Sequence, residues 1–124
     1  MKPHVLLVED DAWLAESYSR VLRKANYSVA VARDGDEAIR QVETKNPDVL
    51  LVDVMLEGQT ILGLLHELQS YDDTAKLPVV VCSALTGFDM SVERLHYYGV
   101  RAILNKATVT PEQLVLTIQE VVTA

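Results

Sequence analysis

The chain has 124 residues, of which 49% are apolar and 23% are charged, so its composition is that of one globular domain rather than a disordered chain. Its 18 acidic and 11 basic side chains give a net charge of −7 at pH 7. Nucleic-acid binding depends on clustered Lys and Arg residues that neutralise phosphates, and the sequence contains no basic run. The composition therefore argues against direct nucleic-acid binding.

The single cysteine, Cys82, lies in an apolar run and is expected to be a buried thiol in a reducing compartment. The apolar stretch near the N-terminus has only four residues, which is too short for a signal peptide. No later segment approaches the roughly 20 apolar residues of a membrane span. We therefore expect a cytoplasmic protein without a membrane contact.

Short apolar runs alternate with helical patterns along the whole chain. This alternation is typical of a parallel sheet that is covered by helices on both faces. The runs expected to form strands are Val5–Val8, Ser28–Ala32, Val49–Val52, Val79–Cys82 and Ala102–Leu104. No linker or internal repeat interrupts the pattern, which predicts one α/β domain over residues 1–124.

The first two helices have recognisable ends. Apolar residues at helical spacing predict a helix over Leu14–Ala25, and Asn26 suits the left-handed position just beyond it. Asp34 followed three residues later by Glu37 is typical of a helix start. The second helix should therefore begin there and end at Asn46-Pro47.

Three further helices complete the pattern. The third is expected over Ile61–Tyr71 and the fourth over Asp89–Tyr98. The fifth has the clearest start, because Thr110 can cap it, Pro111 suits the first helical position and Gln113 can complete a capping box. The side chains of the third helix expected to face the core are Leu64, Leu65 and Leu68.

Polar side chains follow four of the five predicted strands, at the edge where ligands bind in an open parallel sheet. Those side chains are Glu9, Asp10, Asp53, Ser83 and Lys106. Carboxylates held close together raise one another's pKa unless a cation lies among them. Oxygen ligands without a nearby His or Cys favour Mg²⁺, which in turn favours a phosphoryl substrate.

Four segments that carry these residues resemble the receiver domain of two-component response regulators: residues 5–11, 47–56, 80–84 and 99–106. The resemblance covers nearly the whole chain and is closest to single-domain receivers of the chemotaxis type. It implies a flavodoxin-like, doubly wound fold, in which five helices cover a five-stranded parallel sheet of strand order 2-1-3-4-5.

The resemblance also implies roles for the acidic residues. Asp53 matches the phosphoacceptor, whose carboxylate takes a phosphoryl group from a phosphohistidine. Glu9 and Asp10 match residues that hold Mg²⁺, together with Asp53 and the backbone carbonyl of Met55. Mg²⁺ is the only cofactor implied.

The remaining matched positions concern switching. Ser83 matches a switch hydroxyl and Lys106 a lysine that pairs with the phosphoryl group, while Ile103 occupies the output-coupling position where the family commonly has Tyr or Phe. The implied partners are a sensor histidine kinase or phosphotransfer protein and a downstream protein or output domain. The surface of the fourth helix, fifth strand and fifth helix admits a homodimer. Such a chain is a signalling switch that catalyses its own phosphorylation and dephosphorylation.

The sequence departs from the family pattern at Glu57, Ile61, Ile103 and Ala107. A β-branched residue at position 61 does not readily take a positive φ, so we expect the turn there to be built on Gly58. Ala107 replaces a Pro that often follows a cis bond in relatives, and a bond before Ala strongly prefers trans.

These departures keep a second function open, which is a receiver-like interaction scaffold that signals without phosphorylation. A third is a Mg²⁺-dependent phosphohydrolase, although Met55 stands where its second acid is needed. Each motif also has a structural reading, since Glu9–Asp11 could simply begin a helix and Lys106 could be a surface residue. Their joint placement at four strand ends favours the receiver.

Trp13, beside the acidic residues, is expected to pack half-buried.

Overall fold

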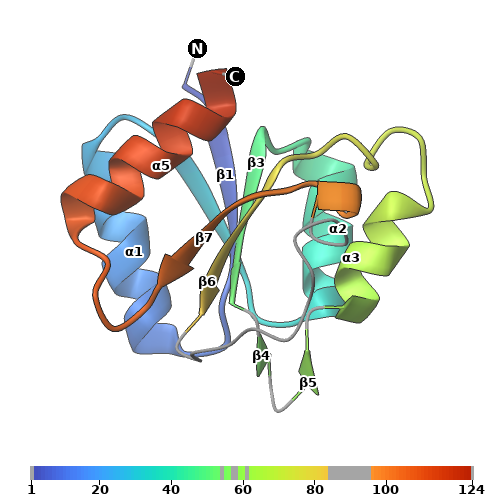
Figure 1. The fold of residues 1–124 in the computed structure, drawn as a ribbon, viewed down its shortest axis with the longest axis horizontal. Helices are drawn as coiled ribbons and strands as arrows, with labels where there is room; N and C mark the ends of the chain where they lie inside the picture. Colours follow the sequence, from blue (N-terminus) through green and yellow to red (C-terminus); the bar gives the residue numbers. More distant parts are fainter. Residues whose placement is uncertain (1, 54, 57–58, 61, 84–95, 124) are drawn as a thin grey trace.

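The structure is a computed structural model that describes residues 2–53, 55–56, 59–60, 62–83 and 96–123. Five parallel strands form a sheet in the order β2-β1-β3-β6-β7 (Figure 1). They are β1 (His4–Val8), β2 (Ser28–Ala32), β3 (Val49–Asp53), β6 (Val79–Ser83) and β7 (Val100–Asn105). The predicted strand order of 2-1-3-4-5 is confirmed, and with it the flavodoxin-like fold.

Helices cover both faces of the sheet. The helices α1 (Ala12–Lys24) and α5 (Pro111–Thr123) lie on one face, and α2 (Gly35–Lys45) and α3 (Leu62–Gln69) lie on the other (Figure 1). The predicted first helix begins two residues earlier than expected, and the third ends two residues earlier. The predicted fourth helix falls mostly outside the described residues, of which 96–97 are helical.

Successive side chains of the central strands enter two separate cores, because a strand points alternate residues to opposite faces. Those that pack with α1 and α5 are Val5, Leu7, Val49 and Leu51. Those that pack with α2 and α3 are Leu6, Val8, Leu50 and Val52. All eight are at most 2% exposed, and each contributes roughly 1.5–3 kcal/mol by burial. Burial on both faces explains why these strands are continuous apolar runs.

The predicted helix starts are confirmed by their hydrogen bonds. The Glu37 N–H donates to Asp34 Oδ1 over 2.8 Å at the start of α2. At the start of α5, the Gln113 N–H donates to Thr110 Oγ1 over 3.1 Å, and the Thr110 N–H donates to Gln113 Oε1 over 3.0 Å. This reciprocal pair is a capping box, which satisfies backbone donors that the helix itself leaves unpaired.

Left-handed residues follow α1 and α2, and the one that follows α1 was predicted. Asn26 has a φ of 74° and Asn46 a φ of 47°. Asn adopts this conformation more readily than most residues, so each helix ends at a position that its sequence tolerates.

A small hairpin at the carboxyl end of the sheet was not predicted. β4 (Met55–Leu56) pairs antiparallel with β5 (Gln59–Thr60) (Figure 1). The signal in the sequence is the two-residue Glu-Gly link, since a Gly in so short a connection is typical of hairpins. The departures at Glu57 and Ile61, and the turn expected on Gly58, lie outside the described residues.

Gly99, which precedes β7, provides a test of the backbone. Its φ is 81°, and an added Cβ would lie 3.0 Å from the carbonyl oxygen of Leu77. We expect Gly99→Ala to lower the free energy of unfolding by about 1–2 kcal/mol, because the positive φ and the close oxygen both oppose a side chain. Gly63→Ala is the matched control: no atom lies within 4 Å of its added Cβ, and Ala favours a helix over Gly by about 1 kcal/mol. Urea unfolding that shows equal effects for both variants would contradict this account.

Candidate functional site

Strand register and alternation bring the predicted polar residues to one edge of the sheet. β1, β3 and β6 are in parallel register, with Val8 beside Val52 and Asp53 beside Cys82. Side chains on the α1/α5 face recur at every second residue. Glu9 and Asp53 continue this series at the ends of β1 and β3, and Lys106 continues it beyond β7. The two-residue period therefore directs all three toward the same space.

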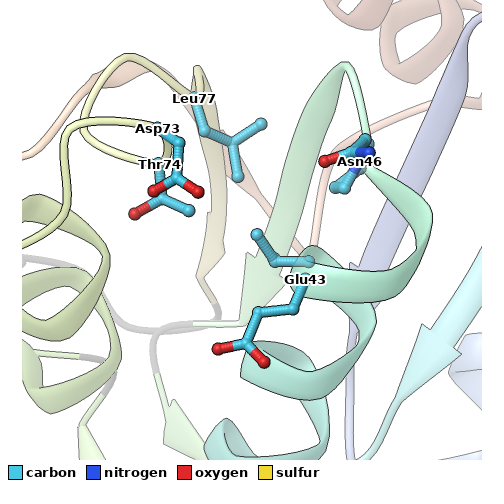
Figure 2. A pocket seen from close by; sticks show the side chains of 7 residues that line it. Glu43, Asn46, Asp73, Thr74 and Leu77 are labelled. Carbon is cyan, nitrogen blue, oxygen red and sulfur yellow. The ribbon is translucent and has the colours of Figure 1, made fainter.

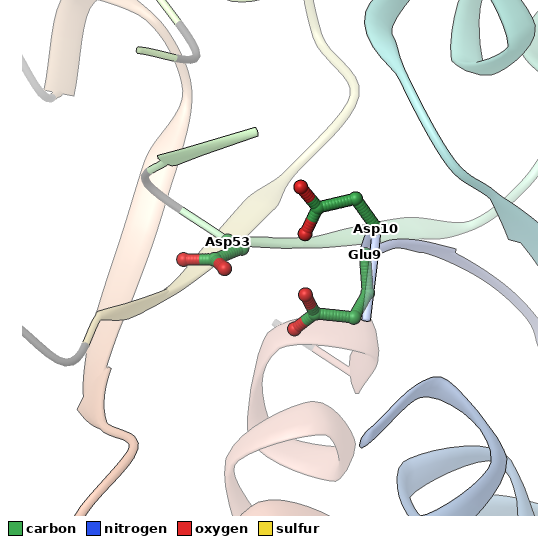
Figure 3. A group of neighbouring side chains, drawn as sticks. All are labelled: Glu9, Asp10 and Asp53. Atoms are coloured by element: carbon green, nitrogen blue, oxygen red, sulfur yellow. The ribbon is translucent and has the colours of Figure 1, made fainter. Parts of the chain in front are cut away.

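Three carboxylates form a cluster at this edge (Figure 3). One oxygen from each of Glu9, Asp10 and Asp53 lies within 4.8 Å of the others. Glu9 is only 2% exposed, whereas Asp53 is partly buried and Asp10 is exposed. An all-oxygen donor set with one open side has the chemistry of a Mg²⁺ site, in which the ion keeps several waters.

Lys106 supplies a positive charge to the cluster. Its Nζ lies 2.7 Å from Asp53 Oδ2 and 2.9 Å from Glu9 Oε1. The backbone N–H of Lys106 donates to the carbonyl oxygen of Ser83 over 2.9 Å, which fixes the start of the loop beside β6. Three carboxylates and one ammonium have a net charge of −2, which a divalent cation would neutralise.

Burial and charge pairing shift the pKa values of this group in definite directions. Burial raises the pKa of Glu9 above its ordinary value, and hydrogen bonds from Lys106 and from the Asp11 N–H offset part of that rise. Burial opposes the charge on Lys106, but its hydrogen bonds to Asp53 and Glu9 outweigh burial and raise the pKa of the ammonium. Lys106 therefore stays protonated at neutral pH.

The start of α1 supports the cluster in a way that the sequence analysis did not foresee. The Asp11 N–H donates to Glu9 Oε2 over 3.2 Å, and Asp11 Oδ1 accepts from the N–H groups of Trp13 and Leu14. Of residues 9–11, Asp11 alone has the purely structural role of beginning a helix, because it caps α1. The expectation that Trp13 is half-buried is wrong: its side chain is 76% exposed, because it lies in the first turn on the outward side of α1.

Ser83 and Ile103 lie on the other side of the sheet edge. Ser83 is 3% exposed and ends β6, where it continues the series of Val79 and Val81 that packs with α2 and α3. Ile103 is the register partner of Val81 and is 48% exposed, because β7 is an edge strand. The predicted switch and output-coupling positions therefore share one face, opposite that of Asp53.

A polar pair underlies the cluster on the α1/α5 side. The Tyr18 hydroxyl lies 3.8 Å from Cys82 Sγ, and Cys82 is the register partner of Asp53. Burial raises the pKa of both groups, so both remain neutral at pH 7. The predicted burial of Cys82 is confirmed, whereas its tyrosine partner on α1 was not predicted.

Two other predicted features are only partly described. The backbone of Met55 lies in β4, beyond the end of β3, and the role of its carbonyl stays a prediction. The described residues contain no cis peptide bond, so the expected trans bond before Ala107 is confirmed. Asn105 Oδ1 accepts from the Ala107 N–H over 2.8 Å and closes this turn.

A separate cavity of about 300 Å³ lies at the opposite end of the strands (Figure 2). Its walls come from the end of α2, including Glu43 and Asn46, and from the segment before β6, including Asp73 and Leu77. Glu43 and Asp73 are exposed to solvent. Since ligands of open parallel sheets bind at the carboxyl ends of the strands, this hollow is not the candidate site.

Comparison with known proteins identifies the family. The model of the response regulator receiver domain matches residues 5–119. The chain belongs to this family. Among curated relatives, this receiver domain is 35% identical over 86 residues to the DNA-binding response regulator MtrA of Mycobacterium leprae, and the match covers 69% of this chain and 37% of MtrA. It is 37% identical over 84 residues to the response regulator MprA of Mycobacterium bovis, and that match covers 68% of this chain and 36% of MprA.

The receiver domain thus spans about a third of the length of these curated relatives. Among solved structures, the chemotaxis protein CheY4 of Vibrio cholerae is 26% identical, with a TM-score of 0.83 and coverage of 98% of this chain and 99% of that one. A CheY-like receiver domain from Methylobacillus flagellatus shares the fold, with 20% identity, a TM-score of 0.83 and coverage of 98% and 99%. Within the described residues, none of the helices is long and apolar enough to cross a membrane.

The role of Lys106 in charge balance gives a direct test. Without metal, we expect Lys106→Met to lower the free energy of unfolding by about 3 kcal/mol, the low end of the range for a broken buried ion pair, because it leaves the buried Glu9 carboxylate without its ammonium partner. Mg²⁺ should then stabilise the variant more than the wild type. Urea unfolding in EDTA and in Mg²⁺ measures both effects, and exposed Lys76→Met is the control. An equal loss in the two lysine variants would contradict the charge-balance account.

Proposed function

We propose that this receiver domain, spanning residues 1–124, accepts a phosphoryl group on Asp53 in a Mg²⁺-dependent reaction. The observation that carries the proposal is the position of the Lys106 ammonium, 2.7 Å from Asp53 and 2.9 Å from Glu9. A carboxylate beside a fixed cation and further acidic groups can receive a phosphoryl group without other catalytic residues, because such a transfer needs mainly positioning and charge neutralisation.

The residues present fit a magnesium ion. Glu9, Asp10 and Asp53 would hold it, with the backbone carbonyl of Met55 as the remaining protein ligand. When bound, Mg²⁺ neutralises charge that develops on the phosphoryl oxygens. Glu9 is held in place by the Asp11 N–H as well as by Lys106, so one side of this ligand set is fixed in advance.

The transfer itself is a displacement at phosphorus. An Asp53 carboxylate oxygen attacks the phosphorus of a phosphohistidine, a P–O bond forms, the P–N bond breaks, and the imidazole leaves with the electron pair. The product is an acyl phosphate on Asp53. Lys106 then pairs with a phosphoryl oxygen in place of the carboxylate oxygen that it binds now.

The output follows from the added charge. We propose that the Ser83 hydroxyl binds the phosphoryl group and that its movement changes the face on which Ile103 lies. The donor is a sensor histidine kinase or phosphotransfer protein, and the recipient of the signal is a downstream protein or an output domain. A homodimer through the fourth helix, β7 and α5, a cytoplasmic location and the absence of direct nucleic-acid contact stay predictions from the sequence.

The scaffold function remains the second candidate, because Ile103 stands where an aromatic ring is usual and is already 48% exposed. A scaffold would bind its partner equally well with and without phosphorylation. The intact-mass measurement described next separates the two functions, because a scaffold that signals without phosphorylation needs no phosphoryl group.

Intact mass after incubation with acetyl phosphate and Mg²⁺ is the first measurement. We expect the gain of one phosphoryl group in the wild type, and none in Asp53→Asn or in metal-free protein. Asp72→Asn, at an exposed carboxylate, is the matched control and should behave as the wild type. No gain in the wild type with this donor or a second one would reject phosphorylation and leave the scaffold.

The rate of the same reaction tests Lys106. We expect Lys106→Met to slow phosphorylation by about a hundredfold, because the ammonium that stabilises charge in the transition state is gone. Lys76→Met should leave the rate unchanged. If Lys106→Met reacts at the wild-type rate, the ion pair is structural and the proposed catalytic role is wrong.

A further inference from the structure

Tyr18 brings a hydroxyl into the core between α1, α5 and the sheet. Its side chain packs with this core, and the hydroxyl lies 3.8 Å from Cys82 Sγ, where either atom can be the donor. Burial raises the pKa of both groups, so the pair stays neutral at pH 7. A thiol is a weak acceptor, so the contact adds little to the stability of the fold. A phenylalanine would pack there without a hydroxyl to desolvate, and packing alone therefore does not account for the tyrosine.

The partner of this hydroxyl, Cys82, lies beside the proposed phosphoacceptor. Cys82 is the register partner of Asp53 on the neighbouring strand, and both continue the series of side chains on the α1/α5 face. Neighbouring strands are about 4.8 Å apart, so the thiol and the Asp53 carboxylate are adjacent. On the other side of β3, Glu9 follows β1, and one of its oxygens lies within 4.8 Å of Asp53 (Figure 3). Asp53 is thus flanked by Glu9 and by Cys82.

The helix α1 contacts both of these flanking residues. At the start of α1, the Asp11 N–H donates to Glu9 Oε2 over 3.2 Å. About two turns further along the helix, Tyr18 contacts Cys82. One rigid element therefore links the flank of Asp53 that comes from β1 to the flank that comes from β6.

The Lys106 side chain passes over Cys82. Lys106 directly follows β7, yet its ammonium bonds to Asp53 at the end of β3 and to Glu9 after β1. Because β6 lies between β7 and β3, this side chain crosses β6, where Cys82 is the last residue on the α1/α5 face. Against the larger effect of burial, the charge of Lys106 lowers the pKa of both Tyr18 and Cys82, as this path requires. Only 13% of the Lys106 side chain is exposed, so most of its length is covered.

We propose that Tyr18, through Cys82, is a positioning residue for Lys106. The Tyr18 hydroxyl holds the Cys82 side chain in place, and Cys82 supports the Lys106 side chain so that its ammonium stays between Asp53 and Glu9. Tyr18 acts through its neighbour and not on the phosphoryl group. The consequence for the reaction rests on the proposed phosphorylation of Asp53, in which a small displacement of the ammonium weakens its stabilisation of the transition state.

Hydrogen exchange of the Lys106 ammonium tests the positioning itself. It is measured by NMR on ¹⁵N-lysine-labelled protein without metal or a phosphoryl donor, and Lys106→Met identifies the signal. We expect slow exchange in the wild type, because two ion pairs hold the ammonium, and exchange about fivefold faster in Tyr18→Phe. Tyr27→Phe is the matched control and should leave the rate unchanged, since Tyr27 is buried in the same core but precedes β2, at the opposite end of the strands. Unchanged exchange in Tyr18→Phe would overturn the proposal, whether or not Asp53 is phosphorylated.

The rate of phosphorylation by acetyl phosphate tests the consequence for the reaction. At saturating Mg²⁺ we expect Tyr18→Phe to react about tenfold more slowly, with the Mg²⁺ affinity and the urea midpoint unchanged. A merely structural role would lower the urea midpoint instead. Cys82→Ala removes the same contact, so the double variant should be no slower than the slower single variant.

Two results of the rate measurement would overturn the positioning role: a wild-type rate in Tyr18→Phe, or effects of Tyr18→Phe and Cys82→Ala that add in the double variant. If the wild type gains no phosphoryl group, the proposed function is wrong. The exchange rate of the Lys106 ammonium then decides the positioning by itself.

Discussion

Lys106 carries the charge that allows three carboxylates to share one edge of the sheet. Oxygens of the buried Glu9 and partly buried Asp53 carboxylates lie within 4.8 Å of each other, and two like charges at that distance repel by roughly 3 kcal/mol at an effective dielectric constant of about 20. Repulsion of this size is a large fraction of the net stability of a domain, which is typically about 5–15 kcal/mol. The ammonium lies within 3 Å of both Glu9 and Asp53 and offsets much of this repulsion. The site is thus tolerated by the fold only because the chain just after β7 returns a cation to the ends of β1 and β3.

The architecture that places Lys106 beside the carboxylates was largely predictable, because a two-residue period determines which side chains enter the core and which enter the site. The apolar alternation that buries Leu7 and Leu51 also determines the direction of Glu9 and Asp53. Strand identity and the capped ends of α2 and α5 follow from local patterns that the tertiary structure does not overrule, whereas the strand order was implied by the resemblance to receiver domains. The meeting of residues from different strands follows from the fold, since parallel strands end at one edge.

Features that depend on neighbours distant in the sequence were not predictable in the same way. The exposure of Trp13 depends on how α1 is rotated against the sheet, and a single aromatic residue gives no signal for that rotation. The Tyr18–Cys82 contact joins residues 64 positions apart, each of which is an ordinary apolar choice on its own element. The β4–β5 hairpin has strands of two residues, which are too short for periodicity to register. In the sequence, only the Gly between the two short strands indicates a hairpin.

In the proposed function, the two faces of the sheet separate the residues that carry the chemistry from those that carry the output. Asp53 and Lys106 face α1 and α5, whereas Ser83 and Ile103 belong to the series that faces α2 and α3. A signal from a phosphorylated Asp53 must therefore cross the sheet edge, and Ser83 is placed to carry it because it follows Cys82, the register partner of Asp53. Ile103 cannot respond as an aromatic ring does, since a β-branched side chain is restricted at χ1 and has no large ring to bury. In the proposed switch, coupling therefore falls to Ser83 and to the packing against an isoleucine that is half exposed from the outset.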